Sequence, residues 1–247
     1  MKGLLRWVLL LGLALIFLQL YFVLRIACMA VVDPQSTAFQ RSEAWRLATE
    51  KGELRWRQQW VDYSQISNNL KRAVIASEDD GFTNHDGVDW DALEKAWQKN
   101  AKAEQRAARK PATRITQGKV QPKAPKIVGG STITQQLAKN LFLSGERTLV
   151  RKGQELVLTM LLEHLLSKDR ILEIYLNSVE WGEGVFGAEA AAQHYFNKPA
   201  SKLSSYEAAR LAVMLPGPRV FEKRPNSAYL ASRARTIVAR MGDAQLP

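Results

Sequence analysis

Cysteine and histidine are scarce in this sequence, and both shortages limit its chemistry. The one cysteine, Cys28, excludes an intramolecular disulfide, so cysteine usage does not identify a redox compartment. The three histidines, His85, His164 and His194, lack the close spacings of zinc ligands, which argues against a histidine-based zinc site. Beyond about residue 75 the chain also lacks convincing alternation of apolar and polar residues. We therefore expect a mainly α fold.

A long apolar run occupies the amino end instead. Residues 7–24 read WVLLLGLALIFLQLYFVL, in which Gln19 is the only strongly polar residue. About 20 apolar residues are enough to cross a bilayer, whereas the apolar region of a cleaved signal peptide is shorter, about 7–15 residues. We predict a cytoplasmic tail at 1–6, a transmembrane anchor at 7–29 and a stalk at 30–54. Lys2 and Arg6 favour a cytoplasmic amino end, although Arg25 weakens this bias.

The net charge of +11 is a local property of the chain. Residues 95–126 contain ten of its 35 basic residues and one acid, Glu104, so the remainder is close to neutral. We interpret the most basic part, about 99–126, as a solvated insertion, with contact to anionic lipid headgroups as the alternative. Nucleic acid is not an expected partner, because neither aromatic stacking groups nor a known reading motif accompany the charge.

Several helices can be predicted from caps and apolar content. Thr132 followed by Gln135, and Ser204 followed by Glu207, are capping-box patterns that begin helices. A helix over 149–166 is rich in apolar residues and is expected to be buried, and further helices are expected over 91–110, 169–177 and 188–196. Pro216 is expected to stop the helix that starts after Ser204.

Two segments partly match known ligand-binding motifs, a dinucleotide-binding loop and a calcium-binding loop, but neither fits. Gly182, Gly184 and Gly187 match the spacing of a dinucleotide loop, but a helix is expected before them and Glu183 would repel phosphates, so we predict a glycine turn. The acidic stretch SEDDGFTNHDG at 77–87 fails as a calcium loop, because Phe82 and Leu93 would fall on essential ligand positions.

Two glutamates are better candidates for chemistry. Glu78 follows the apolar VIAS segment, and Glu155 lies within the 149–166 helix, so both carboxyls could have shifted pKa values suited to acid–base work. Arg151 and Lys152 precede Glu155 by four and three residues and share its side of the helix. A surface ladder of ion pairs, which contributes little to stability, explains this spacing equally well.

Taken together, these segments resemble glycosyltransferase family 51, the peptidoglycan polymerase module. The motifs run in the family's order over residues 55–230: EDDGFTNHDG, GGSTITQQLAKN, RKGQELVLTMLLE, then ILEIYLNSVEWGEGVFGAEAAAQHYF and SSYEAARLAVMLPGPRVF. The resemblance implies a lysozyme-like lobe with a smaller membrane-proximal jaw lobe. We expect the monofunctional type without a transpeptidase domain, and a tail at 231–247.

The resemblance also implies a reaction. Such enzymes are inverting glycosyltransferases that polymerise lipid II into β-1,4 glycan strands and release undecaprenyl diphosphate, with the catalytic domain on the periplasmic side of the bacterial inner membrane. Lipid II, the glycan strand and membrane lipid are the expected partners, together with other cell-wall synthesis proteins. A lysozyme-like lytic enzyme, or an anchored scaffold without activity, remains the alternative.

The family's site residues carry over by motif. Glu78 is expected to be the general base, and Glu155 to stabilise the reacting centre or orient cations, with Mg²⁺ or Mn²⁺ as a possible companion of the diphosphate. A diphosphate leaves as an anion and therefore needs cationic stabilisation. The expected substrate-binding residues are Lys139, Arg147, Arg151, Lys152, Ser131, Thr132, Gln135, Gln136 and Asn140. Asp79 and His85 are expected to hold the loop.

Two features depart from the family pattern. The segment between the first two motifs is unusually long and basic, which leaves the shape of the jaw lobe open there. Asp80 and Gly81 occupy positions where the family often has basic or bulky residues, and the added negative charge is expected to raise the pKa of Glu78.

Overall fold

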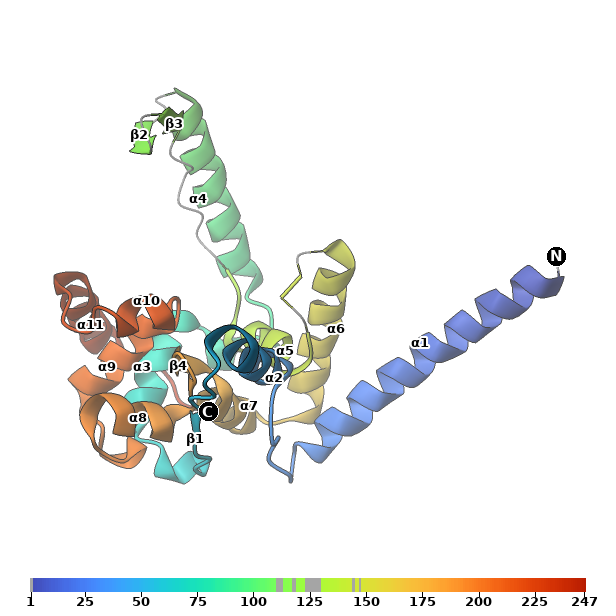
Figure 1. Cartoon of the computed structure of the whole chain (residues 1–247), viewed down its shortest axis with the longest axis horizontal. Coiled ribbons are helices and arrows are strands. Elements are labelled where there is room, and N and C mark those ends of the chain that lie inside the picture. Colours follow the sequence, from blue (N-terminus) through green and yellow to red (C-terminus); the bar gives the residue numbers. More distant parts are fainter. Residues whose placement is uncertain (1, 110–112, 117–118, 123–129, 144, 147) are drawn as a thin grey trace.

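The computed structural model describes residues 2–109, 113–116, 119–122, 130–143, 145–146 and 148–247. Helix α1 (Lys2–Cys28) projects from a helical body on one side, and α4 (Trp90–Arg109) rises from it on another (Figure 1). A short hairpin of β2 (Thr113–Thr116) and β3 (Lys119–Pro122) follows α4. Helices dominate throughout, which confirms the predicted mainly α class.

Nine further helices of the described chain make up the body. They are α2 (Ala38–Arg46), α3 (Asn68–Glu78), α5 (Ile133–Phe142), α6 (Leu149–Leu165), α7 (Lys168–Ser178), α8 (Ala188–Phe196), α9 (Ser205–Met214), α10 (Pro218–Glu222) and α11 (Ala228–Arg240). One π-helical turn, Leu47–Lys51, and the 3₁₀ turns Tyr63–Gln65, Phe82–Asn84 and Ala200–Lys202 connect them.

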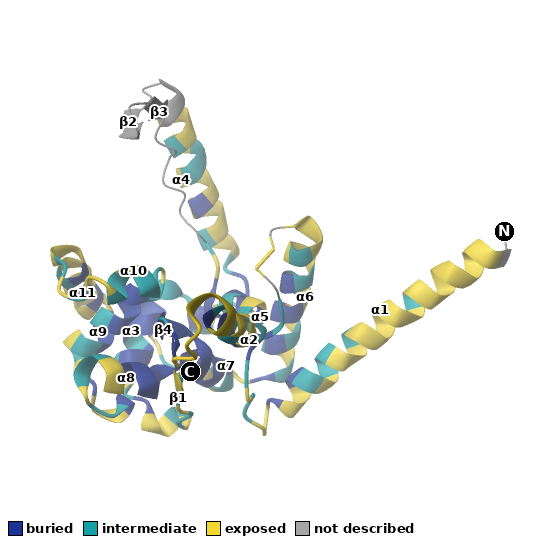
Figure 2. Cartoon of the chain, in the orientation of Figure 1, coloured by how far each residue is buried: buried dark blue, intermediate teal, exposed yellow. Residues whose placement is uncertain are grey.

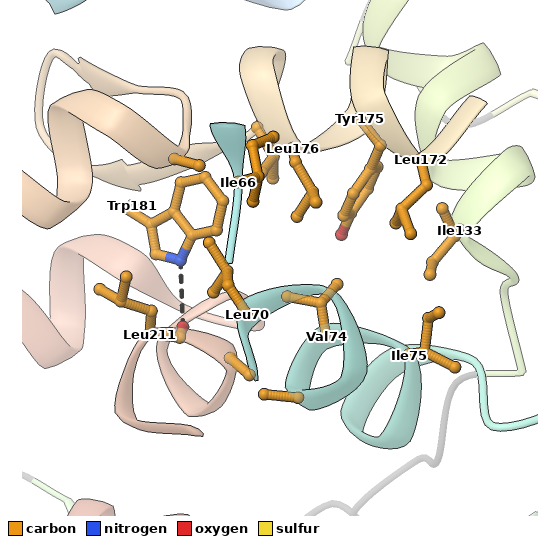
Figure 3. Packing of buried hydrophobic residues seen from close by; sticks show 14 of the residues in the cluster. Ile66, Leu70, Val74, Ile75, Ile133, Leu172, Tyr175, Leu176, Trp181 and Leu211 are labelled. Atoms are coloured by element: carbon orange, nitrogen blue, oxygen red, sulfur yellow. Dashed lines mark hydrogen bonds between the residues drawn. The ribbon is translucent and has the colours of Figure 1, made fainter. Parts of the chain in front are cut away.

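Helix α3 runs through the middle of the core. Its Leu70 and Val74 face Tyr175 of α7, and on the other side α3 packs against α9 (Figure 3). Trp181 closes one end of this layer, where its indole Nε1 donates to the carbonyl of Leu211 at 3.1 Å. All five side chains are inaccessible to solvent, so each apolar one contributes roughly 1.5–3 kcal/mol through burial. Figure 2 shows the buried residues concentrated in this body.

The glycine-rich segment forms a tight hairpin. Strand β5 (Val185–Phe186) pairs antiparallel with β4 (Glu180–Gly182) and parallel with β1 (Arg57–Gln58). Gly184 and Gly187 have φ values of +74° and +85°, which side chains other than glycine rarely adopt. This confirms the prediction of a glycine turn in place of a dinucleotide loop.

The predicted helix starts are also confirmed. At α5 the hydroxyl of Thr132 accepts from the amide of Gln135, whose side chain accepts from the amide of Thr132, and Ser204 and Glu207 repeat this arrangement at α9. Helix α9 ends at Met214, two residues before Pro216.

Helix α6 forms where it was predicted, but the prediction that it is buried is wrong for its amino-terminal half. Leu149 and Val150 are 91% and 84% exposed, and the buried side chains begin only at Glu155. The physical reason is that α6 extends beyond the body, so its first two turns have packed neighbours on one side only (Figure 1).

The regions predicted as a stalk and a tail contain packed helices. Thr37 caps α2 through a capping box, and Gln40 of α2 is fully buried, where its amide donates to the carbonyl of Ser178 at 3.2 Å. Helix α11 buries Leu230 and Ile237 beside α9. The body therefore extends beyond 55–230 at both ends. The basic insertion at 99–126 falls partly outside the described residues.

Helix α1 fits the predicted anchor in length and composition. Within the described chain it is the one helix that is long and apolar enough to cross a membrane, over Gly3–Cys28, and no residue of its most apolar window is buried in the body. At 1.5 Å per residue its 27 residues extend about 40 Å, more than the apolar thickness of a bilayer.

The hairpin supplies a test of the fold. A Cβ added at Gly184 would lie 1.9 Å from the carbonyl oxygen of Arg55, whereas one at Gly52, also at positive φ, would meet open space. We expect Gly184→Ala to lower the unfolding temperature by roughly 8 °C or more, and Gly52→Ala by about 3 °C. Thermal unfolding followed by circular dichroism measures both shifts. Equal shifts would contradict the close approach of the Gly184 backbone to that of Arg55.

Candidate active site

A pocket of about 610 Å³ opens between α2, α5 and α6. Its walls carry cations and amides at one end and mainly apolar groups at the other. The lining residues are Phe39, Ser42, Ser131, Gln135, Gln136, Lys139, Asn140, Leu143, Gly145, Arg151, Lys152, Glu155, Val179, Glu180, Leu215 and Pro218.

The polar end is a cluster of three cations around one carboxylate. Nη1 of Arg151 donates to Oε2 of Glu155 at 3.3 Å, and Nζ of Lys152 donates to Oε1. Glu155 is only 4% exposed, so this is not the surface ladder of ion pairs that the spacing alone allowed. With Lys139 on the same wall, positive charge exceeds negative charge there.

Two properties of this cluster suit it to bind an anion in addition to Glu155. Nε of Arg151 is buried and has no hydrogen-bond partner among the described atoms. The pKa of Lys139 is lowered, mainly because the protein removes part of its hydration; Glu155 opposes the shift, and the like charges of Arg151 and Lys152 add to it. A bound anion would relieve both conditions.

Glu78 lies one hydrogen bond away from the pocket. It is the last residue of α3, and its Oε2 accepts from Nε2 of Gln136, a pocket-lining residue of α5, at 3.0 Å. The carbonyl of the same amide accepts from the hydroxyl of Tyr175 at 3.0 Å. Because Tyr175 is fully buried and its pKa is raised well above the ordinary value by burial, it stays a donor and fixes which side of the amide faces Glu78.

The carboxyl of Glu78 has a raised pKa. Burial is the main cause, and the neighbouring charge of Asp79 adds to it, while hydrogen bonds from Gln136 and Ser77 act in the opposite direction. The expected contribution of Asp80 is absent from these causes, since its side chain is exposed and pairs with Arg240 at 2.9 Å. A carboxylate with a raised pKa is a stronger base at neutral pH.

The loop after Glu78 is held by its own side chains. Oδ2 of Asp79 accepts from the amide of Ile133 at 2.9 Å, at the start of α5, and Oδ1 accepts from Nε2 of His85 at 2.9 Å. The other ring nitrogen of His85 accepts from the amide of Gly87 at 3.1 Å. Asp79 and His85 therefore join the end of α3 to the start of α5.

The far end of the pocket contains residues that the sequence analysis missed. Phe39 and Ser42 of α2 form part of the wall, next to Glu180. Arg219 binds both Glu180, at 2.9 Å, and Glu43 of α2. The pKa of Glu180 is raised, mainly by burial, while Arg219 opposes the shift. This bridge holds α2 against the pocket. In the sequence, the T-x-x-Q pattern at 37–40 is the feature that could have predicted the start of α2.

Comparison with known proteins identifies relatives of this chain. The family model described as transglycosylase matches residues 46–242. A relative from Burkholderia thailandensis is 54% identical over 229 residues, 93% of this chain and 82% of its own, and one from Herminiimonas arsenicoxydans is 51% identical over 248 residues, 100% and 99% of the two chains. Both are named biosynthetic peptidoglycan transglycosylase.

This chain belongs to the transglycosylase family. The resemblance identified from the motifs is thereby confirmed. The match also begins at residue 46 and ends at 242, so it takes in the whole of α11, which the predicted boundary at residue 230 cuts. Helix α2 lies almost entirely before the matched region, although it forms part of the pocket wall.

Most of the expected substrate-binding residues of this transglycosylase meet in the pocket. The structure brings together Ser131, Gln135, Gln136, Lys139, Asn140, Arg151 and Lys152. Thr132 is not among the lining residues, because it is buried and its hydroxyl donates to the carbonyl of Gly87 at 2.6 Å while capping α5. Arg147 lies outside the described residues.

The described residues offer no ready-made site for a divalent cation. No group of three or more histidine, cysteine, aspartate or glutamate side chains comes together in this part of the chain. Both oxygens of Glu155 are engaged by Arg151 and Lys152, whereas Mg²⁺ and Mn²⁺ need free oxygen ligands. The described protein groups therefore do not form a binding site for a divalent cation on their own.

Proposed function

We propose that this chain polymerises lipid II into β-1,4-linked glycan strands and releases undecaprenyl diphosphate, with Glu78 as the general base. Family membership makes it a glycosyltransferase of peptidoglycan strand synthesis. The observation that supports the residue roles best is the hydrogen bond from Gln136 to Glu78, because it places a carboxylate with a raised pKa beside a pocket rich in cations.

In the proposed reaction Glu78 acts on the acceptor. Its carboxylate takes the proton of the acceptor sugar's 4-hydroxyl as that oxygen bonds to the donor's anomeric carbon. The bond from this carbon to the diphosphate oxygen breaks on the opposite face, so the configuration inverts. Gln136 donates to Oε2 of Glu78 and so fixes the position of the carboxylate that receives the proton.

The cation cluster receives the leaving group. The electron pair of the broken bond stays on the diphosphate, whose negative charge is stabilised by Lys139, Arg151 and Lys152. Nε of Arg151, which has no hydrogen-bond partner within the described residues, supports this assignment, since a phosphate oxygen would supply an acceptor. Glu155 orients two of the cations through its ion pairs.

A lytic reaction has less support from the same residues. Hydrolysis needs a second carboxylic acid to protonate the leaving alcohol. Both carboxyl oxygens of Glu155 already accept hydrogen bonds from Arg151 and Lys152, so this carboxyl is held by the cations and is not free to serve a leaving alcohol. A diphosphate leaves without needing that proton.

We further infer that α1 spans the bacterial inner membrane once and places the body on its periplasmic side. Lys2 and Arg6 near the amino end favour a cytoplasmic location for that end. Lipid-linked substrates lie in the same membrane, so the anchor restricts enzyme and substrate to a shared surface. Polymer made from lipid II by purified protein tests the activity, and its complete absence would contradict the proposed function.

The base is tested first by substitution. We expect Glu78→Gln to lower the polymerisation rate by about 10²-fold or more, because the amide cannot accept the hydroxyl proton. Asp80→Asn is the matched control, since it removes an exposed carboxylate two residues away. Polymerisation assays with lipid II measure both, and a Glu78→Gln enzyme close to wild type would exclude the assigned base.

The hydrogen bond from Gln136 predicts a pH effect. Activity requires ionised Glu78, so it is lost as pH falls through the raised pKa. Gln136 lowers that pKa, and Gln136→Leu is therefore expected to move the acid limb of kcat/KM to higher pH by roughly 0.5–1 unit. Asn140→Ala, also in the pocket, should leave this limb in place. A limb that stays fixed in Gln136→Leu would show that Glu78 does not control it.

The cation cluster is tested by binding. Lys139→Ala and Lys152→Ala are each expected to weaken retention of a prenyl diphosphate by roughly 10-fold or more, because each loses a charge-assisted contact. Lys198→Ala, which removes a surface cation paired with Glu207, is the control. Calorimetric titration with farnesyl diphosphate measures the affinities. Unchanged affinity in both pocket variants would rule out the proposed clamp.

A further inference from the structure

The one strongly polar residue of the apolar run has a partner in the body. Nε2 of Gln19 donates to Oε1 of Gln154 in α6 at 3.2 Å, and Nε2 of Gln154 donates back to Oε1 of Gln19 at 3.3 Å. The side chains on the other faces of α1 are exposed, Phe17 by 68% for example. A polar side chain in an apolar span that is paired with another helix marks a specific helix–helix contact.

This contact continues along one face of α1. Phe22 meets the ring of Phe142 in α5 edge to face, with 5.4 Å between the centroids, and the guanidinium of Arg25 lies 5.0 Å from the centre of the same ring. Gln19, Phe22 and Arg25 are three residues apart and so share one side of the helix. The carboxyl-terminal part of α1 is therefore docked on α5 and α6 and does not hang free.

The docked part of α6 is the part that carries the cations. Gln154 directly precedes Glu155 and lies in the same turn as Arg151 and Lys152. The buried side chains of α6 begin at Glu155, whereas Leu149 near its start is 91% exposed. The body thus buries side chains of α6 from Glu155 onwards, and in the preceding turn Arg151 faces the pocket while Gln154 contacts α1.

We propose that Gln19 and Gln154 form a positioning pair through which the anchor helix fixes the first turns of α6, and with them the geometry of the diphosphate clamp. This rests on the proposed function. Neither glutamine touches substrate; both act through Arg151, Lys152 and Glu155. If one side-chain amide is removed, the other is left without its partner in apolar surroundings, where water does not replace the lost hydrogen bonds. The turn of α6 that contains Gln154 then loses its contact with α1.

Full-length protein in vesicles tests the pair. Gln19→Leu and Gln154→Leu are each expected to raise KM for lipid II about five-fold with kcat within two-fold, and the double variant should be no worse than either, because both remove one interaction. Phe17→Leu, on the exposed side of α1, is the matched control and should match wild type. Single variants that match Phe17→Leu, or losses that add in the double variant, would overturn the proposal.

A second measurement separates positioning from simple helix association. Hydrogen exchange of the amides at 149–154 is expected to speed up about ten-fold in Gln19→Leu, with exchange in α3 and α9 unchanged, and to stay at the wild-type rate in Phe17→Leu. Unchanged exchange at 149–154, or a general increase across the body, would contradict a positioning role. If wild-type protein makes no polymer, the proposed function fails; if it does and Gln19→Leu behaves normally, only this inference fails.

Discussion

The hydrogen bond between Gln136 and Glu78 is the contact on which the site depends, because it joins two helices that are distant in sequence. Glu78 ends α3 and Gln136 lies in the first turn of α5. The next residue, Asp79, accepts from the amide of Ile133 at the start of α5, so two consecutive carboxylates fasten the same helix end. Any shift of α5 against α3 would separate the carboxylate from the pocket.

Charge is divided within this site in a way that suits two different tasks. The pKa of Glu78 is raised mainly by burial, and within the described part of the chain no cation is among the causes of the shift, so its carboxylate keeps the basicity that a directly paired arginine would remove. Glu155, in contrast, is surrounded by Arg151 and Lys152. The proposed roles follow this division, with Glu78 accepting a proton and Glu155 holding cations. The separation matters because a cation close enough to stabilise a leaving diphosphate would also weaken a base beside it.

Local patterns predicted the parts of this fold that depend on neighbouring residues. The capping boxes at Thr132 and Ser204 and the glycine turn at 182–187 are such cases, because their hydrogen bonds and φ values are set within a few residues. The same T-x-x-Q pattern at Thr37 would have predicted α2, but its role in the pocket wall depends on Arg219, far along the chain. The exposure of the first turns of α6 was likewise beyond prediction, since apolar content does not show which side of a helix meets protein and which side meets lipid.

The exposed apolar residues at the start of α6 lie on the same helix that contacts α1. Leu149 and Val150 would be a liability in water, but they lie on the helix that contacts the anchor through Gln154. Arg25 directly follows the carboxyl-terminal end of the apolar run. Gln19 lies six residues before it, or about 9 Å along the helix. In the proposed orientation, in which α1 spans the membrane, the contact with Gln19 holds Gln154 and the cations beside it close to that membrane. The diphosphate of a lipid-linked substrate lies at the membrane surface, so the contact that is proposed to support the clamp would also keep the clamp within reach of its ligand.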